Sequence, residues 1–115
     1  MKNFIHALRG IKVFLTETPN VLIHVLAAWV AVLLGFYFRI SEIEWLVLVL
    51  TIGLVFISEA FNTAIEIDIN LTSPEYHPYA RDTKDVAAGA VFLSAIVSII
   101  VGLIIFLPKI IACLR

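Results

Sequence analysis

Three long apolar runs, separated by short polar breaks, constrain the fold of this chain more than any other feature. Hydrophobic residues make up 62% of the 115 residues, and charged residues make up only 15%. A water-soluble domain of this size could not bury that much apolar surface. We therefore predict an all-α membrane protein that forms a single domain, residues 1–115.

Each apolar run is long enough for a membrane-spanning helix. We predict spanning helices at about residues 21–38, 43–66 and 85–107. An amphipathic helix over about residues 3–15 is expected to precede them. Its apolar side carries Phe4, Leu8, Ile11 and Leu15. Because its polar side is basic, this helix suits the surface of an anionic membrane, and packing on the protein's own bundle is the alternative.

Prolines and polar residues mark the breaks between the helices. Thr18, before Pro19, is a plausible N-cap for the first spanning helix. Residues 71–83 carry two prolines and no hydrophobic period, so we expect a polar loop there. The third spanning helix is expected to start near Asp82 and to end at Pro108.

Small residues recur at every fourth position in two of the spanning helices, a pattern that lets helix backbones approach closely. The two stripes are Ala27, Ala31 and Gly35, and Ala90, Ser94, Ser98 and Gly102. We expect close helix contacts at these stripes when the protein assembles.

Basic residues near the helix ends favour a cytoplasmic N-terminus. One side of the membrane would carry Lys2, Arg9, Lys12, Arg81 and Lys84, and the other Arg39, Lys109 and Arg115. The 71–83 loop would then face the cytoplasm, where ATP is present. The formal net charge of −1 suggests no nucleic-acid partner.

A strip of polar side chains follows the second spanning helix. At 3.6 residues per turn, one side of that helix carries Glu59, Asn62, Thr63, Glu66 and Asn70. Glu66 would lie at the interface opposite Trp45, and Glu59 roughly 10 Å deeper. Carboxylates inside a membrane are costly and mark functional sites by default. Pairing with basic groups of other helices is the alternative, but we expect no such partner and interpret His24 as a packing residue.

These groups permit phosphoryl transfer, which needs mainly positioning and charge neutralisation. Glu66 is a hard oxygen ligand of the kind that Mg²⁺ prefers. Glu59 could accept the hydroxyl proton of a membrane alcohol as its oxygen attacks ATP. At the start of the third spanning helix, free backbone N–H groups and Lys84 suit phosphate. The chain has no Walker A sequence and no kinase Gly-rich loop.

Three motifs are specific enough to compare with a known family. They are Glu59-x-x-Asn62-Thr63-Ala64-Ile65-Glu66, Glu75-Tyr76-His77-Pro78 and Lys84-Asp85-Val86-Ala87-Ala88-Gly89-Ala90. Together they resemble the prokaryotic diacylglycerol kinase family of small three-helix membrane kinases. The versions in this chain look like the Gram-positive-type branch, which phosphorylates undecaprenol.

The resemblance implies ATP- and Mg²⁺-dependent phosphorylation of a lipid alcohol, undecaprenol or diacylglycerol, in the bacterial inner (cytoplasmic) membrane. It also implies a homotrimer with sites shared between subunits. Glu59 matches the catalytic base, Asn62 and Ala88 match substrate-binding positions, and Glu66 and Glu17 match metal ligands. The nucleotide-binding positions are Glu75, Tyr76, His77, Lys84 and Asp85.

The chain departs from the family motif at Asn70, where the motif has Asp. Asn keeps the shape of Asp but removes its charge, so one alternative is a family member with reduced activity. A different class is a non-catalytic membrane subunit or small transporter whose polar strip lines an ion path. An ion path would need polar side chains across the whole membrane. The first and third spanning helices add only Ser94 and Ser98, so the polar strip stops partway.

Overall fold

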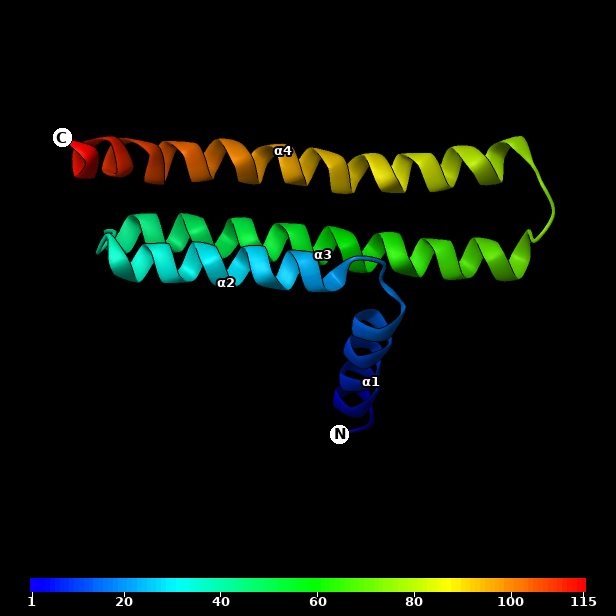
Figure 1. Ribbon diagram of the computed structural model, residues 1–115. Helices are drawn as coiled ribbons and strands as arrows, with labels where there is room; N and C mark the ends of the chain where they lie inside the picture. The colour runs from blue at the N-terminus through cyan, green and yellow to red at the C-terminus, as the bar shows by residue number, and fades with distance from the viewer.

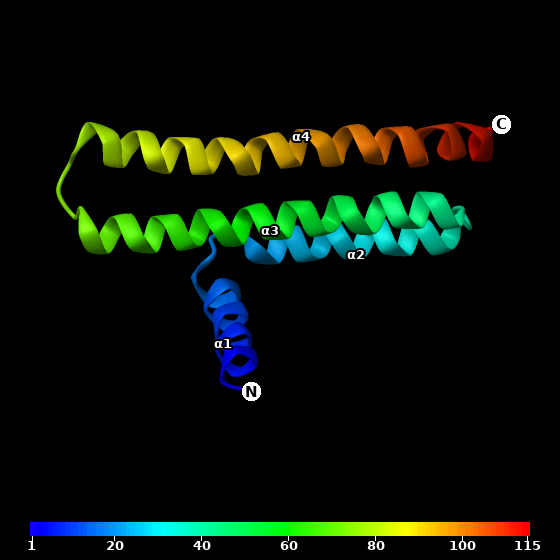
Figure 2. The same ribbon diagram turned by 180° about the vertical axis from the view of Figure 1, so that it is seen from behind.

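The computed structural model describes all 115 residues and consists of four α-helices (Figure 1). They are α1 (Lys2–Glu17), α2 (Val21–Tyr37), α3 (Glu42–Thr72) and α4 (Pro78–Leu114). Helices α2, α3 and α4 run along one common axis, and α1 projects sideways from them (Figures 1 and 2). The all-α architecture predicted from the apolar runs is confirmed.

Helices α3 and α4 are each long and apolar enough to cross a membrane. α2 is shorter, at 17 residues, and the break between α1 and α2 bends the chain by 103°. Seventeen residues extend about 25 Å, at the lower end of the length that a span needs. By length and composition the chain therefore has two spanning helices, or three if α1 and α2 are counted as one bent span.

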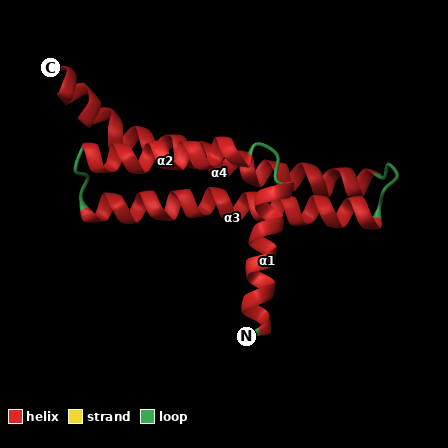
Figure 3. Cartoon of the chain, turned by 60° about the horizontal axis from the view of Figure 1, so that its bottom comes forward, coloured by secondary structure: helices red, strands yellow, loops and turns green.

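Helix α1 leaves the bundle almost at a right angle (Figure 3). Its apolar side has no partner within the chain, since Phe4, Leu8 and Ile11 are each more than half exposed. Its C-terminal part contacts α3, where Phe14 packs edge-on against Phe56 with ring centroids 6.5 Å apart. An unpartnered apolar face at right angles to the bundle favours a position on the membrane surface over packing on the bundle.

The junction between α1 and α2 differs from the prediction. Asn20, in the left-handed conformation with φ 60°, precedes α2, and Thr18 is not its N-cap. Thr18 instead ends α1, is 5% exposed, and shares a 2.7 Å hydrogen bond between its hydroxyl and that of Thr63 in α3. This buried bond fixes the junction against the middle of α3.

Helices α3 and α4 form a long antiparallel hairpin whose tip extends past the level of α1 (Figures 1 and 2). The predicted loop over residues 71–83 is shorter than expected, because α3 continues to Thr72 and α4 already begins at Pro78. His77 caps α4 by accepting a 3.1 Å hydrogen bond at Nδ1 from the backbone N–H of Tyr79. A proline in the first turn with a side-chain cap before it starts a helix, so the expected start near Asp82 was wrong.

Pro108 lies inside α4, which continues to Leu114, so the prediction that it ends the helix was also wrong. A proline removes one backbone hydrogen bond and bends a helix, while the apolar residues after it still favour helix in a bilayer. The last turns of α4 accordingly bend away from the bundle axis (Figure 3). Lys109 binds Glu44 at the start of α3 through a 2.6 Å contact between Nζ and Oε2.

Gly35 allows α2 and α3 to pack closely. The indole of Trp45 lies so near that a Cβ at Gly35 would stand 2.6 Å from Trp45 Cη2. Trp45 also packs on Phe36, with ring centroids 4.8 Å apart. The Trp45 side chain, which the sequence places at a membrane interface, is thus half-buried against α2.

Gly35→Leu is expected to destabilise the protein, because the new side chain must displace Trp45. Overpacking of this kind costs about 1–3 kcal/mol. Thermal unfolding in detergent measures the effect, with Gly53→Leu as the matched control. A Cβ at Gly53 meets no atom within 4 Å, so that variant should keep the wild-type Tm. Equal Tm values for the two variants would contradict the packing role of Gly35.

Candidate active site

The polar strip predicted on α3 contacts α2 at Glu59, the end of α1 at Thr63 and α4 at Asn70. Glu59 and Thr63 are buried, whereas Asn62 and Glu66 are half-buried. Thr63 bonds Thr18 at the α1–α2 junction. The strip therefore starts within the bundle and continues along α3 toward the hairpin tip.

Glu59 pairs with His24 of α2, and the distance between His24 Nε2 and Glu59 Oε1 is 2.7 Å. The side chains are 27% exposed for His24 and 9% for Glu59. The expectation that Glu59 lacks a basic partner was wrong, and so was the interpretation of His24 as a packing residue. A buried carboxylate without a partner is costly, by several kcal/mol. The pair therefore explains how Glu59 can be buried at this position.

Asn62 is the next member of the strip and lies about one helical turn from Glu59. Its Oδ1 is the one buried side-chain N or O atom with no hydrogen-bond partner. Leaving such an atom unpaired costs about 1–3 kcal/mol. A hydroxyl group that enters the site beside Glu59 could donate this missing hydrogen bond.

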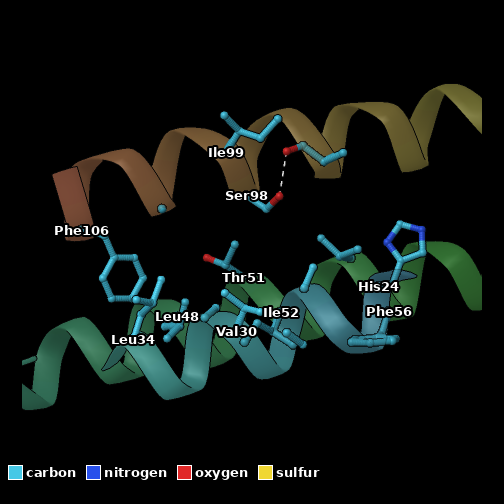
Figure 4. A pocket seen from close by; sticks show the side chains of 16 residues that line it. His24, Val30, Leu34, Leu48, Thr51, Ile52, Phe56, Ser98, Ile99 and Phe106 are labelled. Carbon is cyan, nitrogen blue, oxygen red and sulfur yellow. Dashed lines mark hydrogen bonds between the residues drawn. The ribbon is translucent and has the colours of Figure 1, made fainter. Parts of the chain in front are cut away.

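An apolar groove of about 280 Å³ lies between α2, α3 and α4 (Figure 4). His24 stands at one end of the groove, and Leu34 and Phe106 lie at the other (Figure 4). Members of both small-residue stripes line it, namely Ala27, Ala31, Ser98 and Gly102. Because their side chains are small, they leave room for the groove between the helices. The apolar groove therefore ends at the polar Glu59–His24 pair.

A polar cavity of about 260 Å³ lies at the tip of the α3–α4 hairpin. The residues predicted to bind nucleotide all line it: Glu75, Tyr76, His77, Lys84 and Asp85. Arg81 and Asn70 also line the cavity and were absent from that prediction. The signal for Arg81 was its position, one helical turn before Asp85 and three residues before Lys84 on the same helix. Two cations in a polar cavity suit the phosphates of a nucleotide.

Lys84 is held at the cavity by Asn70, with 2.6 Å between Lys84 Nζ and Asn70 Oδ1. Because Asn70 is neutral, this bond orients the ammonium group without compensating its charge. Lys84 lies in the second turn of α4, which begins at Pro78. Its backbone N–H is therefore within the helix, and the predicted phosphate binding by free N–H groups at this position is wrong.

The two predicted metal ligands lie close in sequence to the bond that joins the end of α1 to α3. Glu17 directly precedes Thr18, and Glu66 follows Thr63 by about one helical turn. Neither carboxylate forms an ion pair within the chain. No group of three or more His, Cys, Asp or Glu side chains could hold a metal alone. Two free carboxylates still fit Mg²⁺, which takes its other ligands from phosphates and water.

Residues 5–106 match the family model described as prokaryotic diacylglycerol kinase. The chain belongs to the prokaryotic diacylglycerol kinase family. This confirms the resemblance inferred from the three motifs. It also confirms that the protein is an enzyme of the lipid kinase type, which excludes the membrane-subunit and transporter alternative.

Curated members of the prokaryotic diacylglycerol kinase family differ in how much of the chain they match. Undecaprenol kinase of Bacillus subtilis is 44% identical over 108 residues, which are 94% of this chain and 88% of the relative. Diacylglycerol kinase of Synechocystis is 35% identical over 96% of this chain and 63% of its own length. Diacylglycerol kinase of Escherichia coli K12 is 31% identical over 64% and 61%, respectively. No solved structure matches the chain significantly.

Ala88 is the one substrate-binding position that the structure does not bring to Glu59 and Asn62. It is exposed on α4, next to the buried Ala87, and lines neither the apolar groove nor the polar cavity. Its role in this kinase family member stays a prediction.

Asn70→Asp is expected to raise the kinase activity several-fold. Asp would turn the bond to Lys84 into a salt bridge and add negative charge in the polar cavity, where the proposed Mg²⁺ and nucleotide would bind. Steady-state kinetics on one lipid give kcat and the KM for ATP. Asn70→Ala, which removes the Lys84 contact, should change activity in the opposite direction. Equal constants for wild type and Asn70→Asp would show that this charge is not needed here.

Proposed function

We propose that the protein transfers the γ-phosphate of ATP to the hydroxyl group of a membrane lipid alcohol, with undecaprenol as the acceptor. One observation carries the proposal: α3 connects the polar cavity at the hairpin tip to the buried Glu59–His24 pair. Asn70 and Glu59, at the two ends of this connection, are about 16 Å apart along the helix. An extended ATP molecule bound in the cavity can bridge that distance.

Glu59 acts as the general base in this proposal. Its carboxylate takes the proton of the lipid hydroxyl, the hydroxyl oxygen attacks the γ-phosphorus, and the bond to the β-phosphate oxygen breaks to release ADP. Lys84 and Arg81 line the cavity and neutralise charge on the phosphates. Mg²⁺, held by Glu66 and Glu17, would neutralise the phosphates further.

The apolar groove supports a long single hydrocarbon chain as part of the substrate. A chain lying between α2 and α4 would place its polar head at the His24 end, beside Glu59. The groove is one channel, which suits the single chain of a polyprenol better than the two chains of diacylglycerol. The similarity to the Bacillus subtilis undecaprenol kinase supports the same choice.

Initial rates in mixed micelles, with undecaprenol and diacylglycerol as alternative acceptors, test the choice of substrate. We expect a higher kcat/KM for undecaprenol at saturating ATP and Mg²⁺. A preference for diacylglycerol would leave the kinase chemistry in place and overturn the assignment of the acceptor.

We also propose a homotrimer in a bacterial inner membrane, with the N-terminus and the hairpin tip in the cytoplasm. Two features support sites shared between subunits. Ala88 and Glu17 are exposed within one chain, and an adjacent subunit could bring the first to the lipid and the second to the nucleotide. The large exposed apolar faces of α2 and α4 can pack against other subunits as well as lipid.

A further inference from the structure

We propose that His24 is a positioning residue for phosphoryl transfer, which acts by holding the Glu59 carboxylate in place. The imidazole would bind one carboxylate oxygen and leave the other free to take the proton of the lipid hydroxyl. This inference rests on the proposed role of Glu59 as the base.

The contact between His24 and Glu59 holds one oxygen of the carboxylate. His24 Nε2 lies 2.7 Å from Glu59 Oε1, and no other hydrogen bond or ion pair reaches the Glu59 side chain within the chain. The contact thus occupies one oxygen of the carboxylate and leaves Oε2 available. His24 also stands at the end of the apolar groove, so it fixes Glu59 where a lipid head would arrive (Figure 4).

Burial strengthens the effect of this contact. Glu59 is only 7% exposed, so bulk water competes little with His24 for its carboxylate. By donating Nε2–H to Oε1, His24 fixes the rotamer of Glu59. Loss of the imidazole should therefore lower turnover and leave nucleotide binding unchanged.

A purely structural link between α2 and α3 would predict something different. Such a link contributes to the stability of the fold, so its loss would lower the Tm and leave the turnover of the folded enzyme unchanged. A double-mutant cycle with Glu59 separates the two roles, because residues that act as a unit are not additive.

The experiment compares wild type, His24→Ala, Glu59→Gln and the double variant, each purified in detergent and assayed for kcat and the KM for ATP. His24→Ala should lower kcat about 10- to 100-fold, as loss of an orienting partner does elsewhere, with an unchanged KM. In the Glu59→Gln background the same substitution should cause no further loss. His24→Gln, whose amide N–H can reach the same oxygen, should restore most of the turnover.

Wild-type kcat in His24→Ala, an equal loss in the Glu59→Gln background, or no rescue by Gln would overturn the proposal. If His24→Ala does not fold, His24→Gln carries the test by itself and must show near wild-type turnover. The proposed function is tested separately: it fails if Glu59→Gln keeps its turnover. An inactive Glu59→Gln beside a fully active His24→Ala would remove only the role of His24.

Discussion

Glu59→Gln is expected to lower kcat about 100- to 10,000-fold, the usual effect of losing a general base, while the protein stays folded and binds ATP. Glutamine has nearly the size of glutamate and can still bond His24 through its amide oxygen, so the helix contact survives. What is lost is the negatively charged oxygen that takes the hydroxyl proton. Turnover at saturating lipid and calorimetric titration with ATP measure the two properties separately.

Glu42→Gln is the matched control for this substitution. Glu42 is exposed in the first turn of the same helix, at the end remote from the polar cavity, and should keep wild-type turnover when neutralised. If Glu59→Gln kept most of its turnover while it still bound ATP, another group would have to be the base.

Glu66→Gln is expected to weaken the response of the enzyme to Mg²⁺ by at least about tenfold. The Glu66 carboxylate is half-buried, carries no basic partner, and lies on α3 between Glu59 and the polar cavity. A neutral amide oxygen is a poorer ligand for Mg²⁺ than a carboxylate. The midpoint of the reaction rate against Mg²⁺, at fixed ATP, should therefore rise.

Asp68→Asn provides the comparison, because Asp68 is an exposed residue two positions from Glu66 on a different side of α3. Its Mg²⁺ midpoint should equal that of wild type. A Glu66→Gln enzyme with an unchanged midpoint and an unchanged maximal rate would remove Glu66 from the metal site.

The helices and the polar strip could be predicted because both follow from local patterns. Apolar runs of spanning length give helices in a membrane, and the 3.6-residue period places Glu59 and Asn62 on one side of α3. Helix ends are harder to predict because several signals compete there. Pro108 can end a helix or bend it, and only the position of the following residues decides between the two. At the hairpin tip, Pro78 started α4 earlier than the charged run at Asp82 suggested.

The Glu59–His24 pair required knowledge of how two helices face each other. Both residues lie roughly four to five helical turns from the connection at residues 38–41, on α3 and α2 respectively. Counting equal distances from that turn in an antiparallel hairpin pairs His24 with a position about one helical turn short of Glu59, so the count alone does not give the pair. A single histidine in an apolar run gave no indication of its partner. The residues predicted to bind nucleotide, in contrast, came from resemblance to the family, since their loop has no periodic pattern.

Incubation of the purified protein with γ-labelled ATP, Mg²⁺ and undecaprenol in mixed micelles tests the central claim most directly. The account predicts label in a lipid monophosphate, formed in step with ADP, and dependent on both Mg²⁺ and the lipid. Label that appeared only as inorganic phosphate, or no labelled lipid with either undecaprenol or diacylglycerol from folded protein, would contradict it.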